Sequence, residues 1–192
     1  MTDCELVIIG ASWGGLQAVG SVLGGLPRDF GIPVLVVQHR AEDAGDLLPW
    51  LLGRAGPLPV REVEDKQPLA GARVLVAPAG YHVLVEADHL ALSTDAQVGF
   101  SRPSIDVAFE TAAHALGPAV AGVVLTGDNS DGAAGLAAVR RRGGFAIVQD
   151  PETAVRPAMP TAALAARPQV VAPLDEIPAL LVRLTRTGEV VR

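Results

Sequence analysis

Short runs of β-branched and aliphatic residues alternate along this chain with longer stretches rich in Ala and Leu. This alternation restricts the possible folds more than any other feature. The clearest apolar runs are Leu6–Ile9, Val34–Val37, Val120–Leu125 and Phe145–Val148. A strand that is apolar at every position must be covered on both faces, as happens in a parallel sheet between two layers of helices. The sequence therefore predicts a three-layer, doubly wound α/β fold around a mostly parallel sheet.

The segments between these runs predict the covering helices and some shorter strands. Helices are expected over Leu16–Leu23, Asp46–Leu52, Ile105–Leu116, Ala133–Arg141, Thr161–Ala166 and Ile177–Arg186. Short strands are expected over Val60–Val63, Arg73–Ala77 and Val170-Val171. Tyr81–Glu86 and His89–Leu92 flank Ala87-Asp88, so they predict an antiparallel hairpin at one edge of the sheet. Trp50 is expected on the packed face of its helix.

The composition excludes several classes of protein. Hydrophobic residues make up 49% of the 192 residues, enough to bury a core. The net charge of −6 provides no basic surface for nucleic acid. Cys4 is the only cysteine, which excludes a disulfide framework and a CxxC metal site. No apolar run approaches the roughly 18 residues of a membrane span, and no signal peptide is evident. We therefore expect a cytoplasmic protein without membrane insertion.

Polar side chains follow three of the predicted buried strands. Ser12 lies in a Gly-rich turn after the first strand, and His39 comes directly after the second. Asp128 and Asp131 lie in the loop that follows Leu125. In an open α/β sheet, the carboxyl ends of the strands meet at one edge, where ligands and catalytic groups gather. A serine needs a base to become a nucleophile, and the base works best when an acid orients it. The convergence predicts a Ser-His-Asp hydrolase.

The Gly-rich turn and His39 also have other interpretations. Such a turn after a first strand is more often a nucleotide-binding loop. Here, however, Ser12 takes the middle glycine position of GxGxxG, and no GxxxxGK[ST] motif occurs. His39 by itself would be a strand-end residue in a structural hydrogen bond. In α/β-hydrolases the chain order is Ser, acid, His, whereas here the acid comes last. This order argues against an ordinary lipase or esterase.

The acidic loop allows two more interpretations. The helix after Gly132 would take its N-cap from Asp128, Asn129, Ser130 or Asp131, each considered by itself. A calcium loop beginning at Asp128 is excluded, because the required glycine would fall on Ala133 and the closing Glu on Val139. The sequence therefore predicts neither a metal ion nor another cofactor.

The sequence around these residues resembles the catalytic domain of the bacterial chemotaxis protein-glutamate methylesterases. The resemblance covers nearly the whole chain, and the matching pieces occur in the family's order. They are Ile8-Ile9-Gly10-Ala11-Ser12-x-Gly14-Gly15, Gln38-His39, Val76-Ala77-Pro78, Arg102-Pro103-Ser104-Ile105-Asp106, Leu125-Thr126-Gly127, Asp131-Gly132-Ala133-Ala134-Gly135-Leu136 and Met159-Pro160. The resemblance implies hydrolysis of γ-glutamyl methyl esters on chemoreceptor helices, with release of methanol. Some members also deamidate receptor glutamines.

The resemblance implies a role for individual residues of the predicted triad. Ser12 corresponds to the nucleophile and His39 to the general base and acid. Asp131 lies within the family's Asp-Gly-Ala piece and corresponds to the residue that orients His39, so it is preferred to Asp128 as the acid.

Three further residues correspond to positions around the reacting atoms. The backbone N–H groups of Trp13 and Asp128 correspond to the oxyanion donors. Arg102 corresponds to a residue that faces the substrate or shapes the site. An equally good interpretation is that Pro103 begins a helix there, with Ser104 as its cap.

The sequence departs from the family pattern next to the triad. Trp13 replaces a small hydroxyl residue, Arg40-Ala41 replaces Met-Pro, Asp128-Asn129 replaces Met-Gly, and Pro157-Ala158 replaces an aromatic-Gly pair. Trp13 could narrow the cleft. The carboxylate of Asp128 would oppose an oxyanion unless it points to solvent.

The family commonly carries an N-terminal phospho-acceptor receiver domain that covers the active site. Here the first strand begins close to Met1, so we expect one methylesterase-like catalytic domain over 1–192 without a receiver domain, and any regulator to act in trans. Two other functions stay open. One is a related hydrolase with a different ester or amide substrate, and the other is a catalytically silent binding module of a sensory assembly. The complete set of Ser12, His39 and Asp131 argues against the silent module.

Overall fold

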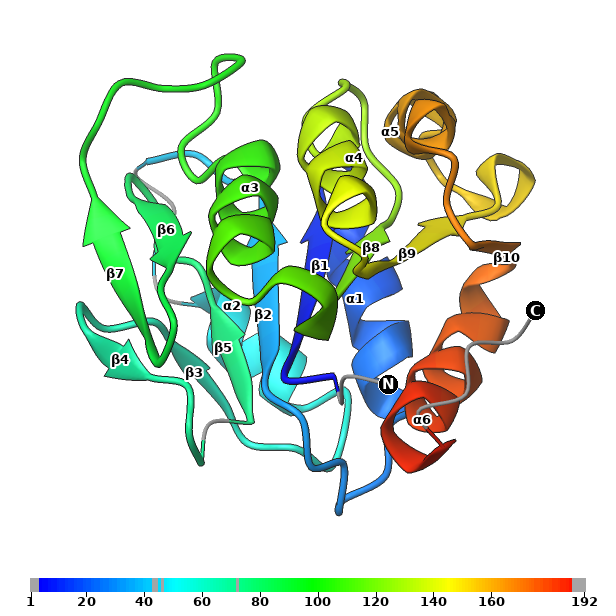
Figure 1. Cartoon of the computed structure of the whole chain (residues 1–192), viewed down its shortest axis with the longest axis horizontal. Coiled ribbons are helices and arrows are strands. Elements are labelled where there is room, and N and C mark those ends of the chain that lie inside the picture. The colour runs from blue at the N-terminus through cyan, green and yellow to red at the C-terminus, as the bar shows by residue number, and fades with distance from the viewer. Residues whose placement is uncertain (1–3, 43–44, 46, 72, 188–192) are drawn as a thin grey trace.

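A seven-stranded, fully parallel sheet forms the centre of the computed structural model, which describes residues 4–42, 45, 47–71 and 73–187. The strand order is β10-β9-β8-β1-β2-β5-β3 (Figure 1). The strands are β1 (Leu6–Ala11), β2 (Val34–Gln38), β3 (Val60–Glu62), β5 (Val74–Val76), β8 (Val120–Val124), β9 (Phe145–Gln149) and β10 (Val170–Ala172). Every residue of β1, β2, β8 and β9 is buried, as their continuous apolar sequences predict.

The sheet reverses its winding direction at β1. The chain proceeds from β1 to its neighbour β2 on one side, and later places β8 on the other side of β1. Such a reversal leaves a crevice beyond the carboxyl ends of the two central strands, which is where α/β proteins bind ligands. Ser12 follows β1 and the acidic loop follows β8, so both predicted site segments emerge at this crevice.

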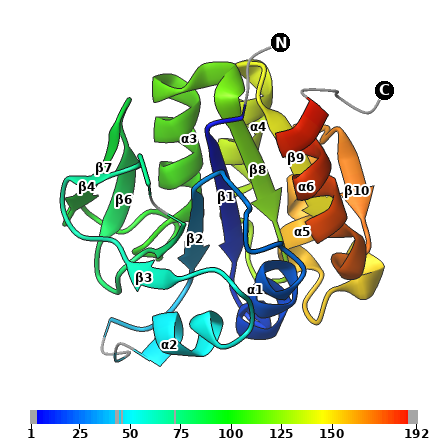
Figure 2. The ribbon, with the colours of Figure 1, turned by 90° about the horizontal axis from the view of Figure 1, so that it is seen from below.

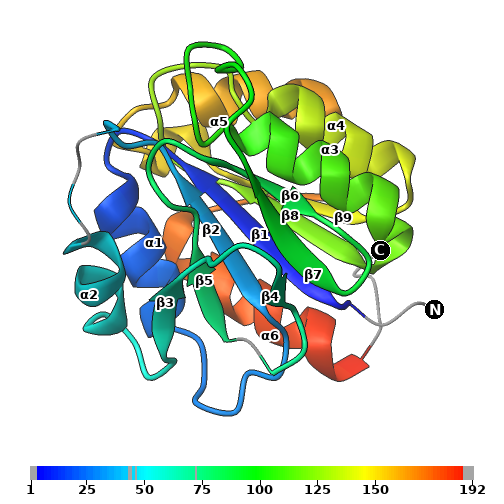
Figure 3. The same cartoon turned by 90° about the vertical axis from the view of Figure 1, so that its left-hand side faces the viewer.

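Helices cover both faces of the sheet, and Figure 3 shows the sheet between the two layers. One layer contains α1 (Gly15–Gly24), α2 (Leu47–Gly53) and α6 (Ile177–Thr187). The other contains α3 (Ile105–Ala115), α4 (Ala133–Arg141) and α5 (Ala158–Ala163). Short 3-10 turns occur at η1 (Gly117–Ala119), η2 (Pro151–Thr153), η3 (Leu164–Ala166) and η4 (Leu174–Glu176). This arrangement confirms the predicted three-layer, doubly wound fold.

The predicted hairpin exists and belongs to a second, smaller sheet. Strands β6 (His82–Val85) and β7 (His89–Ser93) pair antiparallel, and β7 also pairs with β4 (Gln67–Pro68). In Figure 2 this sheet lies to the side of the large sheet, next to α3. Its buried side chains Val83, Val85 and Leu90 join the core on the α3 side. The hairpin is therefore attached by packing, while β3 forms the edge of the large sheet.

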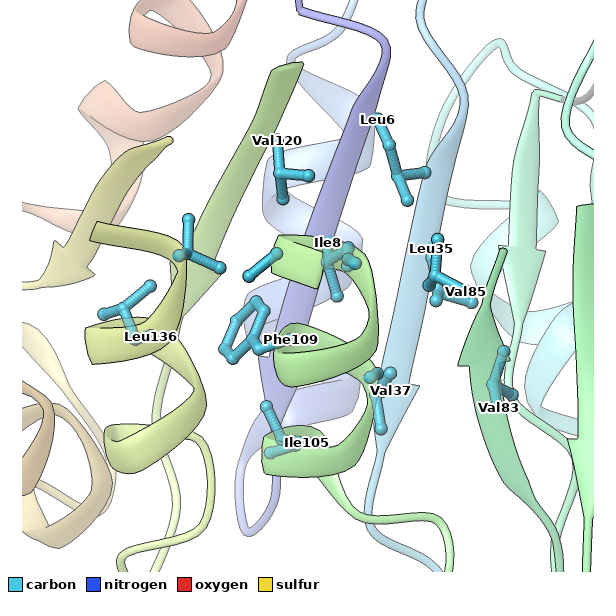
Figure 4. Close-up of a cluster of buried hydrophobic side chains, with 14 of the residues drawn as sticks. Leu6, Ile8, Leu35, Val37, Val83, Val85, Ile105, Phe109, Val120 and Leu136 are labelled. Atoms are coloured by element: carbon cyan, nitrogen blue, oxygen red, sulfur yellow. The ribbon is translucent and has the colours of Figure 1, made fainter. Parts of the chain in front are cut away.

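The core between the sheet and the α3–α4 layer anchors the elements that carry the site. Phe109 is fully buried between Ile8 of β1 and Leu136 of α4 (Figure 4). A Cβ atom on Gly122 would lie 3.0 Å from the Phe109 ring, so the helix packs directly on the backbone of β8. Burial of such a side chain contributes about 2–3 kcal/mol. The N-terminus of α3 is thereby held against the crevice.

Two expectations from the sequence need adjustment. The helix predicted over Thr161–Ala166 is α5 followed by η3, and it begins earlier, at Ala158. The prediction that Trp50 packs inward is wrong, because its side chain is 57% exposed and lies under the guanidinium of Arg54. Asp46, at the predicted start of α2, lies outside the described residues. Within the ranges that the structure describes, no helix is long and apolar enough to cross a membrane.

Candidate active site

Ser12 lies on the sharp turn between β1 and α1. Its backbone N–H donates to the carbonyl of Thr126 at 2.9 Å, which joins this turn to the end of β8. The turn needs Gly14, whose φ of 79° is unfavourable for other residues. A Cβ at Gly14 would also lie 2.9 Å from Val155. The turn holds Ser12 half-buried at the crevice.

Gln38, the buried last residue of β2, ties the turn to His39. Its Nε2 donates to the carbonyls of Ser12 at 2.8 Å and of His39 at 2.9 Å. The N–H of His39 donates to the carbonyl of Ala11 at 3.0 Å. This role of Gln38 is not predicted from the sequence. The sequence feature that could have predicted this role is the position of Gln38 directly before a strand-end histidine. An amide side chain at that position can reach the backbones of two neighbouring segments.

Asp131 contacts His39 across 92 residues of chain. The Nε2 of His39 lies 2.7 Å from Asp131 Oδ2, and the two side chains are 12% and 5% exposed. The same carboxylate accepts hydrogen bonds from the N-terminus of α3. These come from the N–H groups of Ile105 (2.7 Å) and Asp106 (3.0 Å) and from the Ser104 hydroxyl (2.9 Å). Asp131 therefore joins the predicted base to the end of a helix.

The environment of Asp131 favours its charged form. Burial disfavours ionisation, but the hydrogen bond from His39 and the N–H groups of Asp106 and Ile105 outweigh it and lower the pKa of Asp131. Burial raises the pKa of neighbouring Asp106 to about 6, with the charge of Asp131 adding to the effect. The pKa values of the two carboxyls are thus shifted in opposite directions, and the charged Asp131 is the one that can stabilise a protonated imidazole.

Asn129 contacts the other ring nitrogen of His39. Its Nδ2 lies 3.1 Å from His39 Nδ1, and its Oδ1 accepts the N–H of Asp131 at 3.0 Å. From the sequence, Asn129 is only an N-cap candidate and a departure from the family pattern, and its contact with His39 is not predicted. In the part of the chain that the structure describes, no hydrogen bond joins Ser12 Oγ to His39.

Trp13 and Asp128 contribute backbone rather than side-chain groups to the crevice. Among the described residues, neither backbone N–H donates a hydrogen bond within the protein. The side chain of Asp128 is exposed, so its charge lies toward solvent. Trp13 is 63% exposed, and its ring lies 5.5 Å from the guanidinium carbon of Arg156. Free N–H groups at this point are suited to binding a developing oxyanion.

Gly127 allows the loop after β8 to approach the serine. A Cβ atom there would lie 1.9 Å from Met159 Sδ and 2.8 Å from Ser12 Cβ. Only a glycine fits between these two side chains without displacing one of them. The Asp128 N–H is thereby brought next to the turn that carries Ser12.

Arg102 shapes the neighbouring surface. Its Nη1 donates to the carbonyls of Thr94 (2.9 Å) and Asp95 (3.0 Å), and its Nη2 pairs with Glu42 at 2.9 Å. Arg102 thereby fixes the loop after β7 beside the site. The alternative interpretation of this segment is confirmed in part. Ser104 caps α3, but the helix begins at Ile105, so Pro103 precedes the cap and does not begin the helix.

Two cavities meet at His39. The first, of about 390 Å³, is lined by Ser12, Trp13 and Leu16 together with His39. The second, of about 330 Å³, is lined by Phe100 and Arg102 together with His39. Over residues 4–42, 45, 47–71 and 73–187, no group of three or more His, Cys, Asp or Glu side chains is placed to hold a metal ion.

Comparison with known proteins gives consistent results. Residues 7–181 match the family model described as CheB methylesterase. A Leptospira interrogans protein provisionally named protein-glutamate methylesterase/protein-glutamine glutaminase is 41% identical over 189 residues, covering 96% of each chain. An Anaeromyxobacter dehalogenans protein of the same activity name is 42% identical over 184 residues, which cover 95% of this chain and 54% of that protein. The crystal structure of the Thermotoga maritima CheB methylesterase catalytic domain matches with a TM-score of 0.91 and 29% identity, over 95% of this chain and 100% of that chain.

Proposed function

This chain belongs to the CheB methylesterase family, and from that premise we propose that it hydrolyses the γ-methyl esters of glutamate side chains on chemoreceptor proteins. The observation that carries the proposal is the 2.7 Å contact between His39 and Asp131 beside the cavity that Ser12 lines. A serine, a histidine and a low-pKa carboxylate in this arrangement are suited to acyl transfer.

The reaction would begin with attack of Ser12 Oγ on the ester carbonyl carbon. His39 Nδ1 takes the hydroxyl proton, since Nε2 is directed at Asp131. The charge that develops on the carbonyl oxygen would be met by the N–H groups of Trp13 and Asp128. The charged Asp131 stabilises the imidazolium that forms.

Collapse of the tetrahedral intermediate would break the bond to the methoxy oxygen. His39 returns its proton to that oxygen, so methanol leaves and a glutamyl ester of Ser12 remains. Water then attacks the acyl carbon with His39 again as the base. His39 gives the proton it has taken from water to Ser12 Oγ as the acyl bond breaks, which frees the receptor's glutamate carboxylate and restores the Ser12 hydroxyl. A glutamine side chain would follow the same route with ammonia as the leaving group, in line with the second activity in the relatives' names.

The partner proposed from this chemistry is a receptor segment that presents methylated glutamates. The exposed Trp13 lines one of the two cavities that share His39, and Phe100 and Arg102 line the other. Flanking residues of such a segment would pass along these cavities. Regulation in trans stays a prediction.

The test compares methanol release from a methylated chemoreceptor preparation by the wild type and by Ser12→Ala. Release by the wild type alone would support both the substrate and the nucleophile. If neither releases methanol but the wild type cleaves a small activated ester in a Ser12-dependent manner, the triad is active and the substrate is different. No turnover of either substrate would favour the binding module.

A further inference from the structure

The hydrogen bonds of Asn129 fix the orientation of its amide. Its Oδ1 accepts the backbone N–H of Asp131 at 3.0 Å, and a nitrogen at that position could not accept. The NH2 group is therefore the part of the side chain that reaches His39 Nδ1 at 3.1 Å. An NH2 group only donates, so Nδ1 must present its lone pair to Asn129.

The same tautomer follows from the opposite side of the ring. Asp131 has a lowered pKa and is an acceptor-only carboxylate. The 2.7 Å contact therefore requires a proton on His39 Nε2. Asn129 and Asp131 together specify one neutral form of His39, with Nε2–H toward Asp131 and the lone pair of Nδ1 toward Asn129.

This lone pair is the one that the reaction needs. In the proposed function, Nδ1 takes the proton of Ser12, but here Nδ1 is occupied by Asn129. Within the described ranges, Ser12 Oγ makes no hydrogen bond to His39. A ring nitrogen has a single lone pair, so Asn129 and Ser12 compete for it.

We propose that Asn129 is a positioning residue that holds His39 in its base-competent tautomer at rest and must release Nδ1 before Ser12 can attack. The inference rests on the proposed roles of Ser12 and His39. The release is local, because Asn129 directly follows Asp128, whose N–H donates no hydrogen bond within the described residues and is the proposed oxyanion donor. A substrate oxygen bound at that N–H would contact the same loop. Asn129 thus links occupancy of the site to availability of the base.

The test uses Asn129→Ser in the full chain. A serine hydroxyl can still accept the N–H of Asp131 but is too short to reach His39, so the turn is kept and the competing donor is removed. The probe is a small fluorophosphonate, which phosphonylates an activated serine and needs no receptor substrate. We expect its second-order rate constant to rise about fivefold, which corresponds to about 1 kcal/mol, the usual net value of one hydrogen bond.

Three variants complete the design. Ser130→Ala alters an exposed neighbour whose side chain takes no part in the network, and its rate should equal that of the wild type. Asn129→Gly removes both hydrogen bonds and serves as a second test if the serine variant does not fold. Ser12→Ala should abolish labelling. Labelling that persists in Ser12→Ala would refute the proposed nucleophile. If Ser12→Ala is not labelled but the Asn129 variants react at the wild-type rate or more slowly, only the role of Asn129 is refuted.

A spectroscopic readout separates positioning from a merely structural role. In the 15N spectrum of the wild-type protein at mildly alkaline pH, Nδ1 of His39 should be the unprotonated nitrogen and Nε2 the protonated one. In Asn129→Ser, the remaining contact with Asp131 should keep Nδ1 unprotonated, while the Nδ1 resonance moves as the hydrogen bond from Asn129 is lost. A protonated Nδ1 in the wild type, or an unmoved resonance in the variant, would overturn the proposal.

Discussion

Replacing Asp131 with asparagine tests the most connected side chain of the site. Its carboxylate accepts from His39 and Ile105 on Oδ2 and from Ser104 and Asp106 on Oδ1. An amide has one oxygen, so one pair of donors must face an NH2 group. The better placement puts the NH2 in the Oδ1 position, because the Ser104 hydroxyl can turn to accept. The N–H of Asp106 then loses its partner.

The cost follows from these contacts. A buried N–H without an acceptor costs about 1–3 kcal/mol, and loss of a carboxylate from a helix N-terminus costs about 0.3–1 kcal/mol. Removal of the negative charge beside Asp106 offsets part of this. We expect Asp131→Asn to lower the free energy of unfolding by about 2 kcal/mol near neutral pH.

The pH dependence of this difference has a definite sign. The pKa of Asp131 is lowered below its ordinary 3.8 in the folded protein, so folding favours its charged form. Its contribution to stability is therefore present above pH 3.8 and is lost as the pH falls through the lowered pKa. The difference in the free energy of unfolding between the wild type and the variant should be largest near neutral pH and should decrease in strong acid.

Urea denaturation followed by circular dichroism measures the stability, and hydrolysis of a small activated ester measures the activity. We expect the activity to fall at least about a hundredfold, because the imidazolium loses its counter-charge. Asp128→Asn is the matched control, since this exposed side chain on the same loop should affect stability little. The reasoning is refuted if Asp131→Asn matches the control in both assays.

Three further predictions concern the surroundings of the site. The pKa of Asp106 is raised to about 6, so its ionisation destabilises the fold as the pH rises from 3.8 through 6. Asp106→Asn still accepts the N–H of Gly135. In urea denaturation above pH 6 this variant should be about 1–2 kcal/mol more stable than the wild type, and below pH 3.8 the two should be equally stable. Gly127→Ala should lower the stability by about 1–3 kcal/mol because its methyl group would overlap Met159, and an unchanged melting temperature would contradict this packing. Burial raises the pKa of Cys4 to about 11, so iodoacetamide should alkylate the native protein slowly and the unfolded protein quickly; equal rates would show that the thiol is accessible in the fold.

The large sheet could be predicted because each of its central strands is specified by its own short run of residues. Four strands contain continuous apolar runs, with only the last residues of β2 and β9 polar. The predicted bounds of β1, β2, β8 and β9 differ from the observed ones by two residues at most. β4 could not be predicted, since it has two residues, one of them Pro68, and exists only through its pairing with β7. The hairpin was predictable as a pair of strands, but its attachment to a separate sheet depends on packing against α3.

The sequence could predict which residues come together at the site, but not the hydrogen bonds between them. The rule that strand ends meet at one edge places Ser12, His39 and Asp131 together, whatever the loops between them do. It contains no information about side-chain rotation. The choice of Nε2 for Asp131, and the reach of Asn129 to Nδ1, depend on how the imidazole is turned. The helix end that supplies three of the donors to Asp131 is likewise set by tertiary packing.

Two of the positions where this chain departs from its family pattern, Trp13 and Asp128, have a common physical property. Under the proposed roles, Trp13 and Asp128 act through backbone N–H groups, and both side chains are exposed. A main-chain donor does not depend on the side chain attached to it, so substitution there leaves the oxyanion chemistry intact and alters only what borders the cleft. Asp131 acts through both of its oxygens, and a change there affects the fold and the base together. Variation at these two positions is therefore compatible with a conserved reaction. Trp13 would instead affect which receptor segment the cleft accepts.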